Sequence, residues 1–332
     1  MKKRRWLLLG LCFLIVFFCF TGKEADNTTQ YLEPEPDWHK VLYQRGYQTD
    51  AALALIKIEG VITDAPAYAR ENVCDYDTTI DKLEAAFSDP EIKGIMVFIN
   101  SPGGGVYESY EIYRTIRELK QEYGKPVVAY MGPMAASGGY YAALPADIIY
   151  ANPNSLTGSI GVIMAGINIK SLTDKVGIDY VVFKSGANKD MFNSMVEMTP
   201  ESKAIMQSIV DESYADFLAA FMLHRGLDKE TALQLADGRI YTAKQAKQAG
   251  IIDEVAGISA AFDELTKLAE LLDPMIYEYR DSEKNWWKAL LNVSFPGNVL
   301  LNWFGSSPLS EADFAHWPYQ QPRLMYMSAP VF

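Results

Sequence analysis

An uninterrupted apolar run constrains the fold of this chain more than any other feature. It spans Gly94-Ile-Met-Val-Phe-Ile and meets no polar residue before Asn100. A strand without polar and apolar alternation is buried on both faces, which is typical of parallel sheets covered by helices. The run continues into the turn Asn100-Ser-Pro-Gly-Gly-Gly and then into a helical pattern over residues 107–122. This strand, turn and helix predict an α/β fold with a largely parallel sheet.

The same succession of elements continues along the chain. The expected strands cover residues 53–62, 94–99, 127–130, 147–150 and 179–184. The expected helices cover residues 80–88, 107–122, 134–144, 200–225, 229–236, 243–249 and 260–272. Because parallel strands are joined by right-handed crossovers, these units predict repeated strand, turn and helix layers stacked on one another.

Changes in composition divide the chain into four segments. We expect a membrane segment at 1–22, a polar linker at 23–50, the main folded domain at 51–272, which carries the candidate site described below, and an aromatic-rich extension at 273–332. Within the linker, the pattern predicts a short helix around Trp38–Tyr43. Two interpretations of the extension stay open. It is an appendage that packs on the body or on a neighbouring subunit, or it carries a membrane-surface segment around Trp286–Phe304.

Residues 1–22 have the pattern of a signal-anchor. Met1-Lys-Lys-Arg-Arg precedes Trp6–Phe20, fifteen residues without a charge. No Ala-x-Ala-like site follows, so the pattern favours an uncleaved single-pass transmembrane segment over a cleaved signal peptide. By the positive-inside rule the basic end stays in the cytoplasm. The main folded domain is then extracytoplasmic (periplasmic), anchored to a bacterial inner (cytoplasmic) membrane.

Charge and cysteine content limit the possible partners. The net charge of −12, without a Lys/Arg cluster beyond the N-terminus, disfavours a nucleic-acid partner. Cys12 and Cys19 lie in the apolar segment, and Cys74 stands alone outside it, so the body cannot form an intramolecular disulfide. Its stability must therefore come from a hydrophobic core.

A serine in a stretch of small residues is the candidate nucleophile. Ser137 lies in Met134-Ala-Ala-Ser-Gly-Gly, directly after a short apolar strand pattern. A serine hydroxyl is a weak nucleophile until a base takes its proton, and a desolvated lysine can act as that base. None of the three histidines lies in a glycine-rich setting, whereas Lys189 lies in Lys184-Ser-Gly-Ala-Asn-Lys-Asp. We therefore predict a Ser/Lys dyad ahead of a Ser/His/Asp triad.

Glycines near this serine are candidate donors for an oxyanion hole. Gly103, Gly104 and Gly138 can each offer a backbone N–H with no side chain in the way. The two glycine-rich turns both follow strands, which places them at one edge of a parallel sheet. Ser159 supplies a hydroxyl that can hold a neutral amine. Each feature also has a plain alternative, namely a tight turn, a turn serine or a solvated loop lysine for Lys189.

Five motifs, in order and at family-like spacing over about residues 52–270, make the chain resemble signal peptide peptidase A in its short, single-catalytic-domain bacterial form. They are Ile99-Asn-Ser-Pro-Gly-Gly, Ala135-Ala-Ser-Gly-Gly-Tyr-Tyr, Leu156-Thr-Gly-Ser-Ile-Gly-Val, Lys184-Ser-Gly-Ala-Asn-Lys-Asp and Gly238-Arg-Ile-Tyr-Thr-Ala-Lys-Gln-Ala-Lys-Gln-Ala-Gly-Ile-Ile-Asp. Two of them are also similar to motifs of the Clp protease and crotonase superfamily. The resemblance implies the stacked ββα layers of that fold.

The resemblance also implies roles for individual residues. Ser137 matches the nucleophile, Lys189 the general base and Ser159 the serine that orients the lysine. Gly104, with Gly103 beside it, and Gly138 match the oxyanion region. In the short members of the family, serine and lysine come from neighbouring subunits, which implies a dome-shaped homo-oligomeric ring with interior sites. The implied substrates are hydrophobic peptides such as released signal peptides, and no metal or cofactor is implied.

Three alternatives to this function stay open on sequence alone. The first is a related membrane-bound serine protease, of the nodulation-efficiency type, that acts on a specific membrane protein. The second is a non-catalytic scaffold of the same fold, which the joint presence of Ser137, Lys189 and Ser159 disfavours. The third and most distant is a crotonase-like enzyme acting on acyl-CoA.

Overall fold

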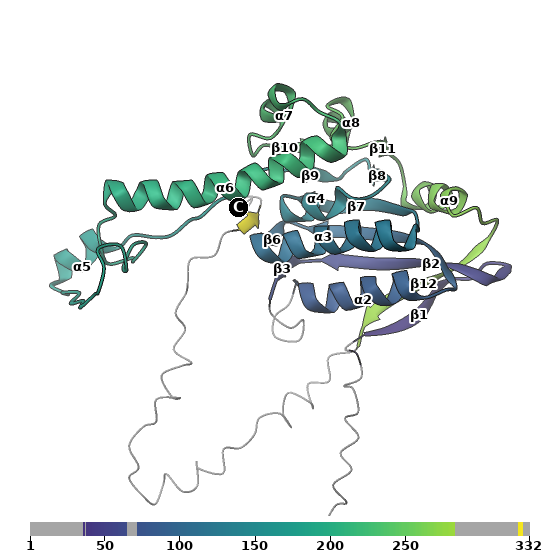
Figure 1. Cartoon of the computed structure of the whole chain (residues 1–332), viewed down its shortest axis with the longest axis horizontal. Coiled ribbons are helices and arrows are strands. Elements are labelled where there is room, and N and C mark those ends of the chain that lie inside the picture. Colours follow the sequence, from purple (N-terminus) through teal and green to yellow (C-terminus); the bar gives the residue numbers. More distant parts are fainter. Residues whose placement is uncertain (1–35, 37, 65–71, 283–324, 328–332) are drawn as a thin grey trace, which may run out of the picture. The chain divides into compact units, whose positions relative to one another are not determined.

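The computed structural model describes Pro36 and residues 38–64, 72–282 and 325–327 (Figure 1). The predicted signal-anchor, the first part of the predicted linker and most of the aromatic-rich extension lie outside the described residues. Among the helices of the described part, none combines the length and apolar character needed to cross a membrane.

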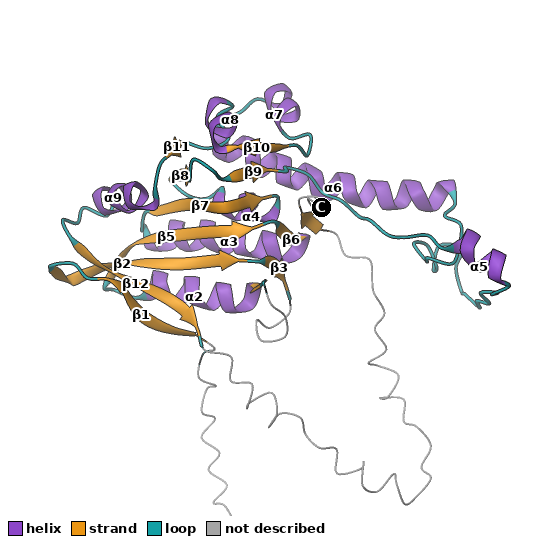
Figure 2. Ribbon diagram, turned by 180° about the vertical axis from the view of Figure 1, so that it is seen from behind, coloured by secondary structure: helices purple, strands orange, loops and turns teal. Residues whose placement is uncertain are grey.

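A largely parallel sheet forms the centre of the body, as Figure 2 shows. Its strands pair in the order β1 (Trp38–Gln44), β12 (Pro274–Asp281), β2 (Gln48–Glu59), β5 (Ile92–Ser101), β7 (Val127–Ala136), β8 (Ile148–Ala151) and β11 (Glu254–Val255). Only the β1–β12 pair in this series is antiparallel. The predicted fold class is therefore confirmed. The apolar run that starts at Gly94 lies in β5, between two parallel neighbours.

Different helices cover the two faces of this sheet, because successive residues of a strand point to opposite sides. In β2, Leu53 and Leu55 pack in one cluster with α9 (Ile258–Leu268), whereas Ala54 and Ile56 belong to the opposite cluster. That larger cluster includes side chains of α2 (Tyr76–Ser88), α3 (Val106–Tyr123) and α4 (Gly138–Ala143). A fully buried large apolar side chain contributes about 1.5–3 kcal/mol, so both clusters stabilise the sheet that carries the glycine-rich turns.

A small second sheet lies where β2 and β5 end. Its order is β13 (Met325–Met327), β6 (Gly103–Gly105), β3 (Val61–Thr63) and β4 (Val73–Asp75). β13 is antiparallel to β6, and β3 is parallel to β6. The glycine strand is thus enclosed by two neighbours, one of which comes from the far C-terminal part of the chain.

The region after residue 155 adds a shorter strand pair to the sheet edge. β9 (Leu156–Gly158) pairs in parallel with β7 and antiparallel with β10 (Ile240–Thr242). Thr242 then starts α8 (Ala243–Gln248) with a capping box that involves Gln245. Asp253 accepts the Ile149 N–H at 2.7 Å and pairs with Arg225. These contacts attach residues 238–253, the last of the five sequence motifs, to the sheet.

Residues 163–199 lie between β9 and α6 (Pro200–Arg225), and we call this segment the arm. It contains the short helix α5 (Lys170–Val176). The arm leads into α6, where Thr199 caps the first turn and proline occupies its first position. The C-terminal half of α6 buries Phe217, Leu218 and Phe221 against the body, while its N-terminal half is largely exposed. The helices α7 (Lys229–Leu235) and α8 follow it.

Three expectations from the sequence need correction. Trp38–Tyr43 is not a helix but part of β1, because its backbone pairs with β12. Residues 179–184 form no strand: they are exposed, and no strand of the described chain pairs with them, although Lys184 forms an ion pair with Asp190. The sheet does not keep to residues 51–272 either, since β12 lies between β1 and β2 within it, and β1 and the start of β2 precede residue 51. The boundary between residues 22 and 23 stays a prediction.

Removal of β12 tests this enlarged boundary. A chain ending at Asp273 loses the buried side chains of Ile276 and Tyr279, about 3–6 kcal/mol for two such residues. That loss is comparable to the whole stability of a typical domain. We therefore expect this chain to show no cooperative thermal transition by circular dichroism, whereas a chain ending at residue 282 retains one. Equal melting temperatures for the two chains would place β12 outside the folded unit.

Candidate active site

Ser137 occupies a sharp turn between β7 and α4. Its backbone has φ 56° and ψ −118°, a conformation that non-glycine residues rarely adopt. The side chain is fully buried, and its Oγ has no hydrogen-bond partner in the described part of the chain. A buried hydroxyl without a partner costs free energy, so it points to a group that another molecule completes. Enzymes of the α/β-hydrolase fold place a nucleophilic serine on a strained strand-to-helix turn of this kind.

Pairing between β7 and β9 brings Ser159 beside Ser137. The last residue pair of this parallel ladder is Ala136 with Gly158, and the two serines follow these residues directly. The Ser137 N–H donates to the Gly158 carbonyl at 2.8 Å, and the Ser159 N–H donates to the Arg239 carbonyl at 2.7 Å. Ser159 also has a positive φ, 50°, and is buried. The structure therefore brings these two predicted residues together.

The predicted oxyanion glycines form β6 and the start of α4. Gly103 has φ 101°, which an L side chain tolerates poorly, and a Cβ at Gly104 would overlap the Ile62 carbonyl oxygen. The first N–H groups of a helix have no partner inside it, and Gly138 is the first residue of α4. Gly139 lies against the Ser101 backbone, which joins α4 to the end of β5.

Two tyrosines hold α4 in this position. Tyr140 is fully buried and donates its hydroxyl to the Ile251 carbonyl at 2.8 Å. Burial raises the pKa of Tyr140 far above its ordinary value, so the hydroxyl keeps its proton and remains a donor. The Tyr141 ring stacks on Tyr113 with 4.6 Å between the ring centroids and packs against Phe217 at 4.5 Å. The turn at Ser137 is thus fixed from its helical side.

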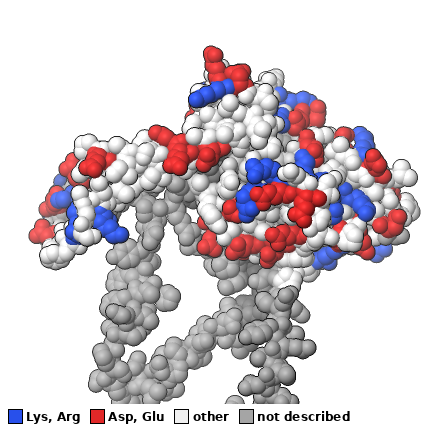
Figure 3. Space-filling model, viewed as in Figure 1, with Lys and Arg blue, Asp and Glu red and all other residues white. Residues whose placement is uncertain are grey.

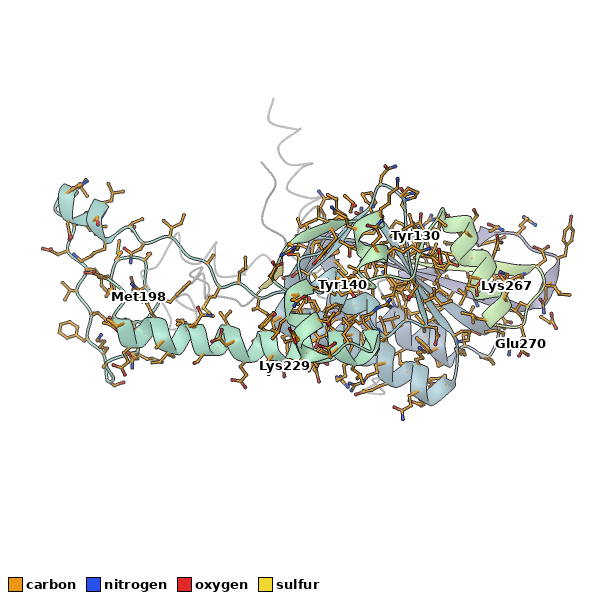
Figure 4. The ribbon with its side chains drawn as sticks, turned by 90° about the horizontal axis from the view of Figure 1, so that it is seen from above. Tyr130, Tyr140, Met198, Lys229, Lys267 and Glu270 are labelled. Carbon is orange, nitrogen blue, oxygen red and sulfur yellow. The ribbon has the colours of Figure 1, made fainter. Side chains whose placement is uncertain are left out.

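Lys189 lies elsewhere, on the arm. It is exposed, and no contact within the described residues joins it to Ser137 or Ser159. Its neighbour Asn188 bonds Glu201 and Ser202 in the first turn of α6. Figure 4 labels Met198, near that end of α6, well apart from Tyr140, which is three residues after Ser137. The structure of one chain therefore brings together all the predicted site residues except the lysine.

The two described histidines offer no substitute base. His39 is exposed on β1, and His224 hydrogen-bonds the Tyr113 hydroxyl at 3.0 Å. Burial, followed by nearby Lys120 and Arg117, lowers the pKa of His224. Neither histidine contacts Ser137 in the described part of the chain. Within the same residues, no group of three or more histidine, cysteine or acidic side chains is arranged to hold a metal ion.

One supporting residue was not identified from the sequence. Ser101 is fully buried, and its Oγ accepts the Gly103 N–H at 3.0 Å, which fixes the turn between β5 and β6. A serine hydroxyl that bonds the backbone two residues later is a common turn device. The signal for this role is the serine two residues before a glycine in the motif Asn-Ser-Pro-Gly-Gly.

Comparisons with known proteins agree with this geometry. The model of peptidase family S49 matches residues 119–272, and the Clp protease model matches residues 70–156. An Enterococcus faecium protein provisionally named signal peptide peptidase SppA is 31% identical over 92% of this chain and 91% of its own length. Protease 4 of Haemophilus influenzae is 32% identical over 74% of the chain, which spans 40% of that protein. Chloroplastic serine protease SPPA of Arabidopsis thaliana is 30% identical over 63% of the chain.

The fold and these matches define a serine peptidase with a Clp-like α/β fold. Within this class the chain belongs to peptidase family S49, the signal peptide peptidase and protease 4 family.

Substitution of Gly104 by alanine tests the importance of the glycine strand. The new Cβ would displace β6 from the Ile62 carbonyl and move its N–H groups away from the nucleophile. Loss of one oxyanion donor typically costs about 10²–10³-fold in kcat, and we expect an effect of that size. Gly257→Ala is the matched control, since a Cβ there meets only Ser259 Oγ, at 4.0 Å. If Gly104→Ala hydrolyses peptides with an unchanged kcat, β6 does not contribute to the oxyanion hole.

Proposed function

We propose that this protein is a membrane-anchored endopeptidase that cleaves hydrophobic peptides, such as released signal peptides, with Ser137 as nucleophile and Lys189 as general base. The observation that carries the proposal is the Ser137 hydroxyl, which is buried near Ser159 and the glycine N–H groups and has no hydrogen-bond partner among the described residues. Family membership supports peptide hydrolysis as the reaction.

The proposed mechanism uses Ser137, Lys189, Ser159 and the glycine N–H groups as follows. A neutral Lys189 amine takes the Ser137 proton while Oγ attacks the peptide carbonyl carbon. The N–H groups of Gly104 and Gly138 stabilise the oxyanion, with Gly103 shaping the turn. The resulting ammonium returns its proton to the leaving amine, the C–N bond breaks, and an ester on Ser137 remains. The Lys189 amine then deprotonates a water, whose oxygen attacks the ester carbonyl carbon. The bond from that carbon to Ser137 Oγ breaks, the acid product leaves, and Lys189 returns the proton to Oγ. Ser159 holds the amine in place.

A neighbouring copy is the proposed source of the lysine. Lysine acts as a base where burial disfavours its charged form, whereas Lys189 of a single chain is exposed and remote from Ser137. An arm from a second copy would supply the amine and bury it at the same time. We therefore propose a homo-oligomeric ring with sites shared between subunits. Residues 1–22 would anchor it in the inner membrane with the body on the outer, periplasmic side.

The edge of β6 is the proposed binding site for the peptide. β13 pairs with Gly103–Gly105 as an antiparallel strand, so this edge has the backbone geometry that strand addition requires. Backbone bonds of this kind favour extended peptides and depend little on their sequence. A folded protein offers no such strand, which is consistent with peptides as substrates.

Single substitutions test the dyad. We expect Ser137→Ala and Lys189→Ala each to lower kcat for a hydrophobic reporter peptide by about 10³-fold or more, because the nucleophile or its base is lost. Lys203→Ala is the control, since Lys203 is also exposed and lies near the same end of α6. Full activity in either dyad variant would refute the assignment.

Mixing the two inactive variants tests whether the site is shared. If serine and lysine come from different copies, an equal mixture that is dissociated and reassembled should regain about a quarter of the wild-type sites. Each restored site combines the intact Ser137 of one chain with the intact Lys189 of the other. A mixture that stays inactive after reassembly would show that both residues must belong to one chain.

Truncation of the C-terminus tests the peptide site. A chain ending at residue 324 lacks β13, while a chain ending at residue 327 keeps it. Because β13 and a substrate strand need the same edge of β6, we expect the shorter chain to have a lower KM with an unchanged kcat. Steady-state kinetics with one reporter peptide measures both. Equal KM values for the two chains would show that the substrate does not bind at the edge of β6.

A further inference from the structure

The loop that carries Lys189 is closed by an ion pair that the proposed mechanism does not use. Lys184 Nζ lies 2.6 Å from Asp190 Oδ1 and donates a second hydrogen bond to the Ala187 carbonyl at 2.9 Å. Lys189 lies inside the loop that this pair closes, and its own N–H donates to the Gly186 carbonyl at 3.2 Å. Both bonds from the Lys184 side chain thus end within two positions of the proposed base.

The Asp190 carboxylate of this pair is charged and largely shielded from water. Its side chain is 11% exposed, whereas that of Lys184 is 33% exposed. The hydrogen bond from Lys184 holds the pKa of the Asp190 carboxyl below its ordinary value. The carboxylate is therefore ionised at neutral pH, and among the described residues it is paired with Lys184 and not with Lys189.

An aspartate directly after a lysine that acts as a base is a disadvantage unless another cation binds its carboxylate. A lysine acts as a base only in its neutral form, and a carboxylate nearby favours the ammonium form instead. Neighbouring residues can form such a pair, as Arg117 and Glu118 do on α3 with 3.8 Å between Nη2 and Oε1. An unpaired Asp190 has the same reach to Lys189, so the base depends on a second cation in the loop.

Charged groups on α5 and α6, the helices nearest to this loop in the chain, have contacts of their own. Glu201 of α6 accepts a hydrogen bond from Asn188 Nδ2 at 3.1 Å. On α5, Lys170 forms an ion pair with Asp174. Figure 3 shows basic and acidic side chains together at the end of the molecule that carries α5. The other charged side chains of this region have no described contact with Asp190: Lys175, Asp179, Glu197 and Lys203. The pair that Asp190 forms within the loop is thus separate from these groups.

We propose that Lys184 is a positioning residue for the reaction: it binds the Asp190 carboxylate and so leaves the Lys189 amine available as the base. Lys184 touches neither substrate nor nucleophile in this role and acts only through Asp190. The role rests on the proposed function, since it requires that Lys189 takes the Ser137 proton. It adds a second lysine, on which the pH dependence of the reaction relies.

The pH dependence of kcat/KM in Lys184→Ala tests this role. With the full chain and a hydrophobic reporter peptide, kcat/KM should rise with pH as the base loses its proton and then reach a plateau. In Lys184→Ala the unpaired Asp190 carboxylate stabilises the ammonium form of Lys189. We therefore expect the midpoint of the rise to move about one pH unit higher. Activity below the midpoint then falls about 10-fold, whereas the plateau at high pH stays that of the parent chain.

Further substitutions separate the charge of Lys184 from its place in the loop. Lys184→Ala combined with Asp190→Asn removes the carboxylate together with its partner, so the midpoint should return to the parental pH. Lys184→Arg keeps a cation beside Asp190 and should keep the parental midpoint. Lys170→Ala is the matched control, because it breaks the ion pair with Asp174 on the same arm and should change neither midpoint nor plateau. If Lys184→Ala melts at a lower temperature than the parent, Lys184→Met replaces it, since methionine keeps most of the side-chain length without the charge.

Two results would overturn the role of Lys184. One is a parental midpoint in Lys184→Ala, including the case in which only the plateau is lower, because the lysine then supports the loop and not the charge state of the base. The other is a double variant whose midpoint stays high. Failure of the proposed function has a different signature, since Lys189→Ala then keeps full activity and both assignments fall. If Lys189→Ala is inactive while Lys184→Ala keeps the parental midpoint, the dyad stands and only the role of Lys184 is refuted.

Discussion

The parallel ladder between β7 and β9 is the interaction on which the rest of the site depends. It ends at Ala136 and Gly158, and both chains then turn through positive φ values at Ser137 and Ser159. Such turns cost about 1–3 kcal/mol each and persist only where the surroundings fix them. Here the Gly158 carbonyl accepts a hydrogen bond from the Ser137 N–H. Tyr140 and Tyr141 fix the position of α4, the helix that follows Ser137. The sheet thus positions Ser137, the proposed nucleophile, without any bound substrate.

The body and the arm differ in how they are stabilised. The body carries the serine, the glycines and a continuous core, whereas the arm carries Lys189 and buries few of its own side chains. A single rigid helix, α6, joins them. Within one chain, the predicted serine and glycines therefore lie together, and the predicted lysine lies apart from them on the arm. Under the proposed function, the complete site forms only on assembly.

Local patterns in the sequence were sufficient for most of the body. Strands such as β5 are uninterrupted apolar runs, and the glycine-rich turns that follow them mark the functional edge. Ser137, Ser159 and the glycines were therefore found together. Local patterns failed where distant pairing decides. Trp38, Val41 and Leu42 have helical spacing, but β12, more than 200 residues later, makes this segment a strand. Tyr180–Phe183 has strand-forming residues and no partner strand.

The position of β13 has a consequence for how the enzyme responds to its surroundings. β13 belongs to the same chain as the glycine strand, so its local concentration is set by the chain and not by the amount of protein. Dilution of the protein therefore does not release β13 from β6. If substrates bind the edge of β6 as proposed, a peptide must displace β13, so that a scarce or weakly binding peptide is cleaved less than its affinity for a free edge would allow.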